Sequence, residues 1–332
     1  MTSNADRPAL VARVRAIDWR TYGLPLALLV IVVAGTMASP YFLIDTSKQG
    51  LDIIRWGNII DVLVRSSLSG ILSVGMTYVI LTGGIDLSVG AIVGIAGVAG
   101  ATFGDFGPVA MLSAGLLTGL VVGLVNGFLV TYGRVVPFIA TLATMTIARG
   151  LALTLTSSAP VRIEDPTYLA LGAGRLFETI PYMVIVAAVI TFIGWFGLAR
   201  TRFGREVYVV GGNPEASRLS GIPVKRTIFF VYVISGLCAG MAAVLDSART
   251  ATAQPSAGSG YELDAIAAVV VGGTSLFGGR GTIVGTIFGV LIIQTISNIF
   301  VLLNVPFNAQ LMVKGVIILA AVMLQRRAGD EG

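Results

Sequence analysis

The sequence predicts an all-α polytopic membrane protein with about ten transmembrane helices. Of its 332 residues, 55% are hydrophobic and 12% are charged, whereas about a quarter of the residues of a soluble domain carry a charge. Its apolar residues gather in runs of about twenty, the length at which a helix crosses a bilayer. Glycines and an acidic residue interrupt one of these runs at TGGIDLSVG, residues 82–90. At least one membrane helix should therefore be broken or re-entrant.

The predicted spans follow one another through a single transmembrane domain, residues 22–325. Residues 1–21 are polar and basic and lead into a run long enough to span, so we expect a retained cytoplasmic segment and not a cleaved signal peptide. A shorter run at 263–273 is either a tenth span or a re-entrant hairpin, and residues 326–332 form a cytoplasmic tail. The other spans are predicted near 22–43, 58–82, 86–104, 108–132, 136–156, 180–199, 227–249, 282–303 and 308–325.

The distribution of basic residues favours ten crossings with both termini in the cytoplasm. Segments rich in Lys and Arg stay on the cytoplasmic side of a membrane. Nine crossings would put Arg326 and Arg327 outside, whereas ten keep them inside together with the basic loop 200–226. The other basic residues predicted to lie inside are Arg7, Arg13, Arg15, Arg20, Arg134 and Arg280.

The basic loop between the sixth and seventh spans is predicted to contain a short helix. Asn213 can accept a hydrogen bond from the first turn, and Pro214 suits the first helical position. Glu215 and Arg218 suit the helix dipole, and Gly221 can adopt the left-handed conformation that ends a helix. About two turns are too few for a stable isolated helix in water. The helix therefore lies against its own membrane domain or docks into another protein.

The outer loop at 157–179 is polar and long enough to form a small external cap. This cap either receives a partner or serves as a solvated connector. Its polar and turn-forming residues are Arg162, Glu164, Asp165, Pro166, Arg175 and Glu178.

Glycine recurs every four residues along two predicted spans. Small residues at this spacing let helices approach closely, so each ladder is predicted to be a packing face, with the wall of a permeation path as the alternative. Each ladder follows an acid-bearing segment interrupted by glycines, at 82–90 and 261–279, and the two blocks run in opposite directions in the predicted topology. This arrangement suggests an inverted repeat. The ladders are Gly115, Gly119, Gly123 and Gly127, and Gly281, Gly285 and Gly289.

Charged residues inside the predicted spans are candidates for function, because a charge at the bilayer centre costs at least about 2.5 kcal/mol. Asp86 follows a pair of glycines and is predicted to cap a half-helix, and Asp264 lies in the run at 263–273. The others fall toward the outer half, where they line a polar funnel or form structural ion pairs. These are Asp61, Arg65, Arg149, Asp246 and Lys314.

The composition excludes several classes of site. There is no histidine and one cysteine, Cys238, which excludes histidine-based nucleophile pairs, imidazole zinc sites and a disulfide within the chain. GGTSLFGGRGT at 272–282 lacks the Lys-Ser/Thr ending of a phosphate loop, and that motif is absent from the sequence. We therefore predict a chain that is not an enzyme, with no metal site and no cofactor of its own, in which any ATP is bound by another subunit. The net charge of +5 reflects residues that border spans and does not indicate nucleic-acid binding.

Four blocks in order resemble the permease subunits of bacterial ATP-binding cassette importers for ribose, xylose and galactose. The resemblance covers roughly residues 60–325, and Val136 stands where the family has a second proline before Pro137. The blocks are GMTYVILTGGIDLSVGAIVGI (75–95), NGFLVTYGRVVPFIATLATMTIARGL (126–151), FGREVYVVGGNPEASRLSGI (203–222) and SGYELDAIAAVVVGGTSLFGGRGTIVGTIFGVLII (259–293).

This resemblance implies a monosaccharide permease in the lipid bilayer of a bacterial inner membrane. Its expected partners are cytoplasmic ATPase subunits, a periplasmic sugar-binding protein and a second permease, either another copy or a paralogue. The short helix of the basic loop would sit in a groove of the ATPase and couple ATP hydrolysis to transport. The residues expected to carry this coupling are Gly204, Gly212, Asn213, Pro214, Glu215, Ala216 and Gly221.

A sugar path through the central spans is expected to use an aromatic ring for the apolar face of the sugar and hydroxyl or amide groups for its edges. One alternative is a branched-chain amino acid permease of the same architecture. Another is a secondary transporter coupled to ions, which Asp86 and Asp246 permit but which gives the basic helix no role. The path residues predicted are Asp86, Asn126, Phe138, Thr141 and Thr144.

Overall fold

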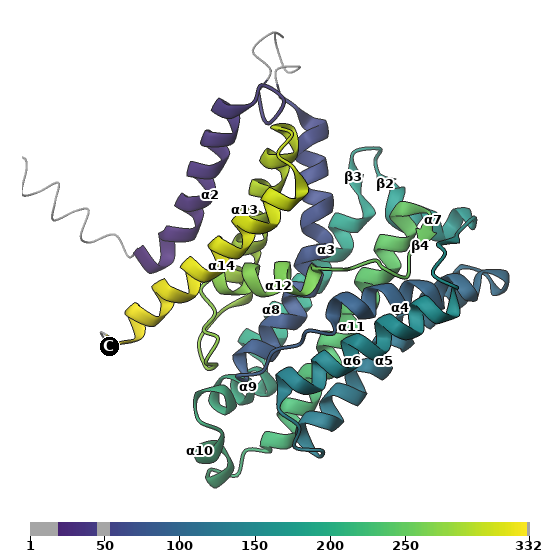
Figure 1. Ribbon diagram of the computed structural model, residues 1–332. Helices are drawn as coiled ribbons and strands as arrows, with labels where there is room; N and C mark the ends of the chain where they lie inside the picture. The colour runs from purple at the N-terminus through teal and green to yellow at the C-terminus, as the bar shows by residue number, and fades with distance from the viewer. Residues whose placement is uncertain (1–18, 45–53, 331–332) are drawn as a thin grey trace, which may run out of the picture.

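A computed structural model describes residues 19–44 and 54–330, which form a bundle of helices (Figure 1). Of the predicted N-terminal segment 1–21 and tail 326–332, residues 1–18 and 331–332 lie outside the described residues. Residues 326–330 of the predicted tail continue α14. The helices are α2 (Trp19–Ala38), α3 (Trp56–Leu81), α4 (Val89–Thr102), the 3-10 turn η2 (Gly104–Phe106), α5 (Pro108–Thr131), α6 (Pro137–Leu155), α7 (Pro166–Ala173), α8 (Tyr182–Arg200), α9 (Arg202–Gly212), α10 (Pro214–Leu219), α11 (Val224–Thr250), α12 (Tyr261–Val271), α13 (Ile283–Leu302) and α14 (Phe307–Asp330). Four two-residue strands complete the fold, namely β1 (Val161–Arg162), β2 (Arg175–Leu176), β3 (Ile180–Pro181) and β4 (Thr252–Ala253).

Six of the described helices are long and apolar enough to cross a membrane: α3, α5, α6, α8, α11 and α13. They confirm an all-α polytopic membrane protein. The span expected at 86–104 is shorter than predicted, because α4 begins at Val89 after a break. The 11 residues of α12 give a length of about 16 Å, roughly half the apolar thickness of a bilayer. The run at 263–273 is therefore too short to be a full span by itself.

The centre of the bundle is formed by α3 and α11, which pack together and run in opposite directions (Figure 1). Every residue of α3 from Ser66 to Leu81 is buried, because α8, α11, α12 and α13 all pack against this helix.

The glycine ladder of α5 packs directly on α11. A Cβ added at Gly119 would lie 2.8 Å from Cα of Gly240, and one added at Gly123 would lie 3.1 Å from Cα of Val233. Two helices at this distance touch backbone to backbone, the arrangement that small residues permit in membranes. The ladder is therefore a packing face, as predicted.

Two glycines of the second ladder, Gly285 and Gly289, lie on α13 and pack at α12, whereas Gly281 precedes α13 and faces Thr274. Gly285 meets the backbone of Gly272, and Gly289 meets that of Ala268. The helices of each half of the chain pack on the first helix of the other half, because α4 and α5 pack on α11 while α12 and α13 pack on α3. This exchange supports the predicted inverted repeat, with α3–α6 as one half and α11–α14 as the other.

One end of the bundle is covered by α7 and the short strands. β1 pairs antiparallel with β4, with Val161 opposite Ala253. The hydroxyls of Tyr168 and Ser247 share a hydrogen bond of 2.8 Å, which attaches α7 to α11. The segment predicted to form an external cap is thus ordered and fastened to the bundle.

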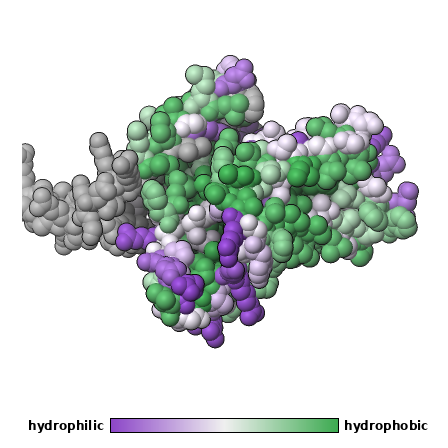
Figure 2. All heavy atoms as spheres, turned by 60° about the horizontal axis from the view of Figure 1, so that its bottom comes forward, coloured by the Kyte–Doolittle hydropathy of each residue, from purple (hydrophilic) through white to green (hydrophobic). Residues whose placement is uncertain are grey.

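The opposite end of the bundle carries α9 and α10 (Figure 1). In a view that brings this end forward, hydrophilic residues gather over it, whereas the surface of the helices beside it is mostly hydrophobic (Figure 2). The contrast is what a membrane protein presents where a polar loop leaves its apolar spans.

Candidate functional site

The short helix α10 has the caps that its sequence predicts. Oδ1 of Asn213 accepts a hydrogen bond of 2.9 Å from the backbone N–H of Ala216, and Pro214 occupies the first turn. Gly221 has a φ of +78°, in the left-handed region that ends helices.

Most of the surface of α10 is exposed. Among the residues of α10, Ser217 is buried. The Ser217 hydroxyl donates a hydrogen bond of 2.9 Å to the carbonyl of Val209, which fixes α10 on α9. Leu219 is 75% exposed. Arg218 donates two hydrogen bonds to Glu215, of 2.6 and 3.1 Å, and this lowers the pKa of the Glu215 carboxyl. The helix therefore presents an apolar side chain beside an internally neutralised ion pair.

The neighbouring helix α9 anchors α10 to the membrane helices. The backbone of Gly211 lies against the carbonyl of Leu81, the last residue of α3, so that an added Cβ would collide with that oxygen. The same carbonyl accepts a hydrogen bond of 2.9 Å from the N–H of Gly279. The hydroxyl of Tyr208 donates to the carbonyl of Gly281 at 2.7 Å. We call this meeting point of α9, the end of α3 and the 272–282 turn the α9 junction.

The glycines predicted to act in coupling have different surroundings. Gly204 is buried at the corner between α8 and α9, where an added Cβ would collide with the carbonyl of Leu198. Gly212 and Gly221 have no atom within 4 Å of an added Cβ. A second close contact is made by Gly211, which was not among the predicted residues. The sequence alone does not show which of two adjacent glycines faces a neighbouring helix. The coupling role of Gly204, Gly212 and Gly221 stays a prediction.

A buried polar network lies at the break between α3 and α4. Asp86 is fully buried. Its Oδ1 accepts hydrogen bonds from the backbone N–H and the hydroxyl of Ser88, at 3.0 and 2.6 Å. Its Oδ2 accepts one of 2.7 Å from the hydroxyl of Ser235 on α11. The carboxylate thus holds the turn before α4 against α11. The N-cap of α4 is Ser88, and no side chain caps its first turn, so the prediction that Asp86 caps this helix is wrong.

The same network connects three of the five predicted path residues. The amide of Asn126 on α5 donates to the hydroxyl of Ser88 at 2.8 Å and accepts from Thr144 on α6 at 2.7 Å. Asp86, Asn126 and Thr144 are thus joined through Ser88. Thr141 is buried beside them and donates to the carbonyl of Ile85 at 3.2 Å. Phe138 lies apart, half exposed on α6. Ser88 and Ser235 were missed because a serine within an apolar run carries no distinguishing signal.

Three of the outer intramembrane charges have partners within the chain. Asp246 pairs with Arg249 at 3.0 Å. Lys314 pairs with both carboxylate oxygens of Asp264, at 2.9 and 3.0 Å. Arg149 donates to the carbonyls at 255 and 257, at 2.8 and 2.7 Å. Structural ion pairing, one of the two predicted alternatives, therefore holds for Asp246 and Lys314, whereas Arg149 binds backbone carbonyls.

The remaining two charges of that group, Asp61 and Arg65, are exposed on α3. Arg65 lines a cavity of about 330 Å³ that also contains the pair of Lys314 and Asp264. A polar cavity and ion pairs thus coexist at this end of the bundle.

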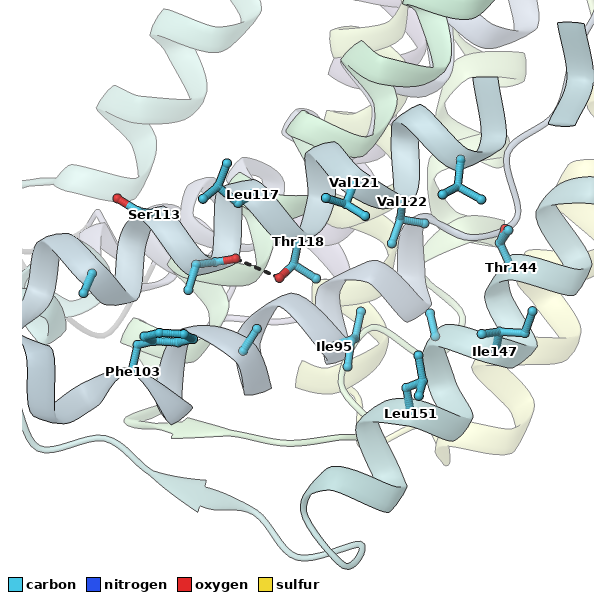
Figure 3. Close-up of a pocket in the computed structure, with 15 residues that line it drawn as sticks. Ile95, Phe103, Ser113, Leu117, Thr118, Val121, Val122, Thr144, Ile147 and Leu151 are labelled. Atoms are coloured by element: carbon cyan, nitrogen blue, oxygen red, sulfur yellow. Dashed lines mark hydrogen bonds between the residues drawn. The ribbon is translucent and has the colours of Figure 1, made fainter. Parts of the chain in front are cut away.

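A second cavity, of about 700 Å³, opens between α5 and α6 with α4 as its floor (Figure 3). The hydroxyls on its wall already have partners, because Thr118 donates to the carbonyl of Ala114 and Ser113 to that of Val109, at 2.8 and 2.7 Å. These hydroxyls can only accept further hydrogen bonds, so this cavity offers a ligand mainly van der Waals contacts. Its apolar lining includes Ile95, Leu117, Val121, Ile147 and Leu151.

Comparison with known proteins identifies a family and several relatives. Residues 58–322 match the family described as branched-chain amino acid transport system, permease component. The chain is 44% identical over 305 residues to the ribose import permease protein of Bacillus subtilis, covering 91% of each chain. It is 38% identical over 314 residues to the D-allose transport system permease protein of Escherichia coli, covering 94% of this chain and 93% of the relative.

A third relative is the L-arabinose transport system permease protein of Escherichia coli. The identity is 37% over 317 residues, covering 93% of this chain and 91% of the relative. No solved structure matches the chain.

Proposed function

The chain belongs to the family of branched-chain amino acid transport system permease components, and on that premise we propose that it is the membrane-spanning permease of a monosaccharide importer driven by a separate ATPase. The three relatives described above are named for ribose, allose and arabinose, which are all monosaccharides. Their high coverage favours a sugar over a branched-chain amino acid, although the family description names the latter.

The observation that carries the coupling role is the placement of α10. A helix of six residues cannot be stable alone in water, and this one has few contacts beyond α9 and the start of α11. It is capped, exposed and apolar at Leu219, which is 75% exposed. These properties fit a helix that completes its burial in a groove of the ATPase.

The α9 junction gives this helix a mechanical connection to the membrane domain. Because Gly211 touches the carbonyl of Leu81 and Tyr208 bonds to the carbonyl of Gly281, α9 reaches both interrupted segments of the bundle. A displacement of α10 by the ATPase would therefore move the end of α3 and the 272–282 turn together. These segments lead into α4 and α13, the half-helix and the glycine-lined helix of the two repeats.

The remaining features of the importer follow from the same premise. We place ten crossings in the domain 22–325, the tenth made by α12 together with the 272–282 turn that continues it to the α9 junction. In this topology α10 and both termini are in the cytoplasm and α7 is on the periplasmic side of a bacterial inner membrane. The partners are cytoplasmic ATPase subunits, a periplasmic sugar-binding protein and a second permease. ATP is bound by the ATPase, and this chain acts by binding and conformational change.

An ion-coupled transporter is less well supported. Such a mechanism needs an acid that can load and release an ion, yet both oxygens of Asp86 accept hydrogen bonds from the protein and Asp246 is paired with Arg249. It would also leave α10 without a partner.

Reconstitution in liposomes tests this function. The permease, its ATPase and its binding protein should together take up D-ribose, D-allose or L-arabinose when ATP is supplied on the cytoplasmic side, and L-leucine should not be taken up. Omission of either partner should abolish uptake. Concentration of solute by the permease alone, driven by an ion gradient, would overturn the proposal, as would uptake of leucine in place of sugars.

A further inference from the structure

We propose that the polar cavity between α3, α12, α13 and α14 is a monosaccharide subsite of the permease itself, an inference that rests on the proposed function. The cavity has a volume of about 330 Å³, within the range of small-molecule sites. These four helices come together away from α10, toward the end of the bundle where α13 ends and α14 begins (Figure 1). We call it the outer cavity.

The outer cavity contains buried hydroxyls that lack partners. Ser69 on α3 is 7% exposed, and within the described residues neither its hydroxyl nor that of Ser297 on α13 has a hydrogen-bond partner. A buried polar group without a partner is costly. Both serines are among the residues that line the outer cavity, with their hydroxyl oxygens buried behind its surface. Rotation of either side chain toward the cavity would let a ligand with hydroxyl groups pair with it.

Two amides add donors and acceptors to the same wall. Gln294 lies one turn before Ser297 on α13 and is 8% exposed. Gln310 on α14 donates its N–H to the carbonyl of Val305 at 2.9 Å, which leaves its amide oxygen as an acceptor. Tyr261 contributes an aromatic ring to the lining. Hydroxyls, amides and a ring are the groups that match the edges and the apolar face of a sugar.

The one carboxylate that lines the outer cavity is already paired within the chain. Lys314 neutralises Asp264 through contacts of 2.9 and 3.0 Å, and Arg249, which also lines the cavity, is paired with Asp246 at 3.0 Å. The carboxylate is therefore not free to bind the ammonium group of an amino acid. The guanidinium of Arg65 can donate to hydroxyl oxygens as well as to anions. This distribution fits a polyhydroxylated sugar better than a zwitterion.

Protection of an introduced cysteine tests the subsite. Because the native Cys238 is buried, Gln310→Cys supplies an accessible thiol in the outer cavity. In vesicles that contain the full permease with its ATPase but no binding protein, D-ribose, D-allose or L-arabinose should slow the reaction of this thiol with a small hydrophilic reagent. The expected slowing is about threefold at twice the dissociation constant, and L-leucine should have no effect.

Serines on α3 supply a matched pair of variants. Ser69→Ala should raise the sugar concentration needed for half-maximal protection by about fivefold, the usual effect of one lost hydrogen bond. Ser66→Ala should leave protection unchanged, because Ser66 is equally buried and without a partner among the described residues but lines an apolar groove between α3, α8 and α13. Gln294→Ala provides a second variant in the outer cavity with the same expected loss.

Failure of the subsite is distinguishable from failure of the proposed function. Uptake of the same sugars by the complete wild-type importer is measured in parallel. If sugar is taken up but no sugar protects Gln310→Cys, or if this thiol does not react at all, the subsite is wrong and the importer function stands. If Ser66→Ala and Ser69→Ala weaken protection equally, the assignment of the cavity is also wrong. If the importer carries leucine and no sugar, both proposals fall.

Discussion

Two polar side chains of this protein bind the backbone just before or at the start of a helix and lie in opposite environments. Asn213 caps α10 by accepting from Ala216 at 2.9 Å, and Asp86 precedes α4 and accepts from the backbone of Ser88 at 3.0 Å. Asn213 is exposed, whereas Asp86 is fully buried and also bound to α11 through Ser235. The polar groups at the break before α4 thus find their hydrogen-bond partners within the chain, whereas we propose that the exposed surface of α10 is covered by the ATPase.

The two regions are connected by the α9 junction. The buried break and the 272–282 turn are the parts that move in our proposal, and α10 is the part on which force acts. Substitutions should therefore separate into those that weaken the fold and those that leave the fold intact but disconnect it from the ATPase.

The largest effect is expected from Ala216→Arg. A long charged side chain on the exposed face of α10 would have to enter the groove of the ATPase, and such a change costs about 2 to 4 kcal/mol in a tight interface. Association with the ATPase should weaken by roughly 30- to 1000-fold, measured by titration of the ATPase against the permease in nanodiscs. Thermal stability of the permease should not change.

The control for this substitution is Ala173→Arg, which makes the same change at an exposed alanine of α7, at the other end of the bundle. It should not alter association with the ATPase. Equal weakening by both variants would contradict the assignment of α10 as the docking helix.

The next largest effect is expected from Asp86→Ala. Removal of this carboxylate leaves the N–H and hydroxyl of Ser88 and the hydroxyl of Ser235 without their acceptor, which should lower the free energy of unfolding by about 3 kcal/mol. Asn213→Ala removes the exposed side-chain cap of α10 and should lower the free energy of unfolding by about 1 kcal/mol or less. Thermal unfolding in detergent measures both, and similar losses would remove the distinction between the two regions.

A smaller effect is expected at the α9 junction. Gly211→Ala places a methyl group against the carbonyl of Leu81, and overpacking of this kind costs about 1 to 3 kcal/mol. Uptake driven by ATP should fall by roughly 10- to 100-fold while the ATPase remains bound.

Gly212→Ala is the matched control, because no atom lies within 4 Å of an added Cβ there. Its uptake should equal that of the wild type. If Gly211→Ala also transports normally, α9 does not transmit force through this contact.

The smallest effect is expected from a change of pH, acting on the exposed pair of Glu215 and Arg218 on α10. Arg218 lowers the pKa of Glu215, so the pair is fully formed above the usual pKa of a glutamate and is lost only as the pH falls through the lowered value. Between about pH 6 and 8 the carboxylate is ionised, and association with the ATPase should show no pH dependence from this group. A dependence in that range that disappears in Glu215→Gln would contradict this assignment.

The sequence predicted the parts of the structure that local chemistry determines. The apolar runs predicted the membrane helices, and Asn213, Pro214 and Gly221 predicted the start and end of α10. The glycine spacing predicted a close packing face on α5, and the structure shows that this face lies against α11. These features depend on residues close together in the chain.

Features that depend on distant contacts could not be predicted in the same way. The helix α9 was not expected, since its fixed position depends on the carbonyl of Leu81 and the turn at 272–282. Arg149 binds carbonyls at 255 and 257, which no periodicity reveals. Phe138 was grouped with the path residues because of its ring, and the structure leaves it half exposed on α6.

Protection of Leu219 by the ATPase tests the central claim most directly. Leu219→Cys introduces an exposed thiol on α10 while Cys238 stays buried, and Phe177→Cys supplies an exposed thiol at the other end of the bundle. We predict that bound ATPase slows the labelling of Leu219→Cys by at least about tenfold, the protection given by ligand at roughly ten times its dissociation constant, and leaves Phe177→Cys unchanged. Labelling of Leu219→Cys at the same rate with and without bound ATPase would contradict the account.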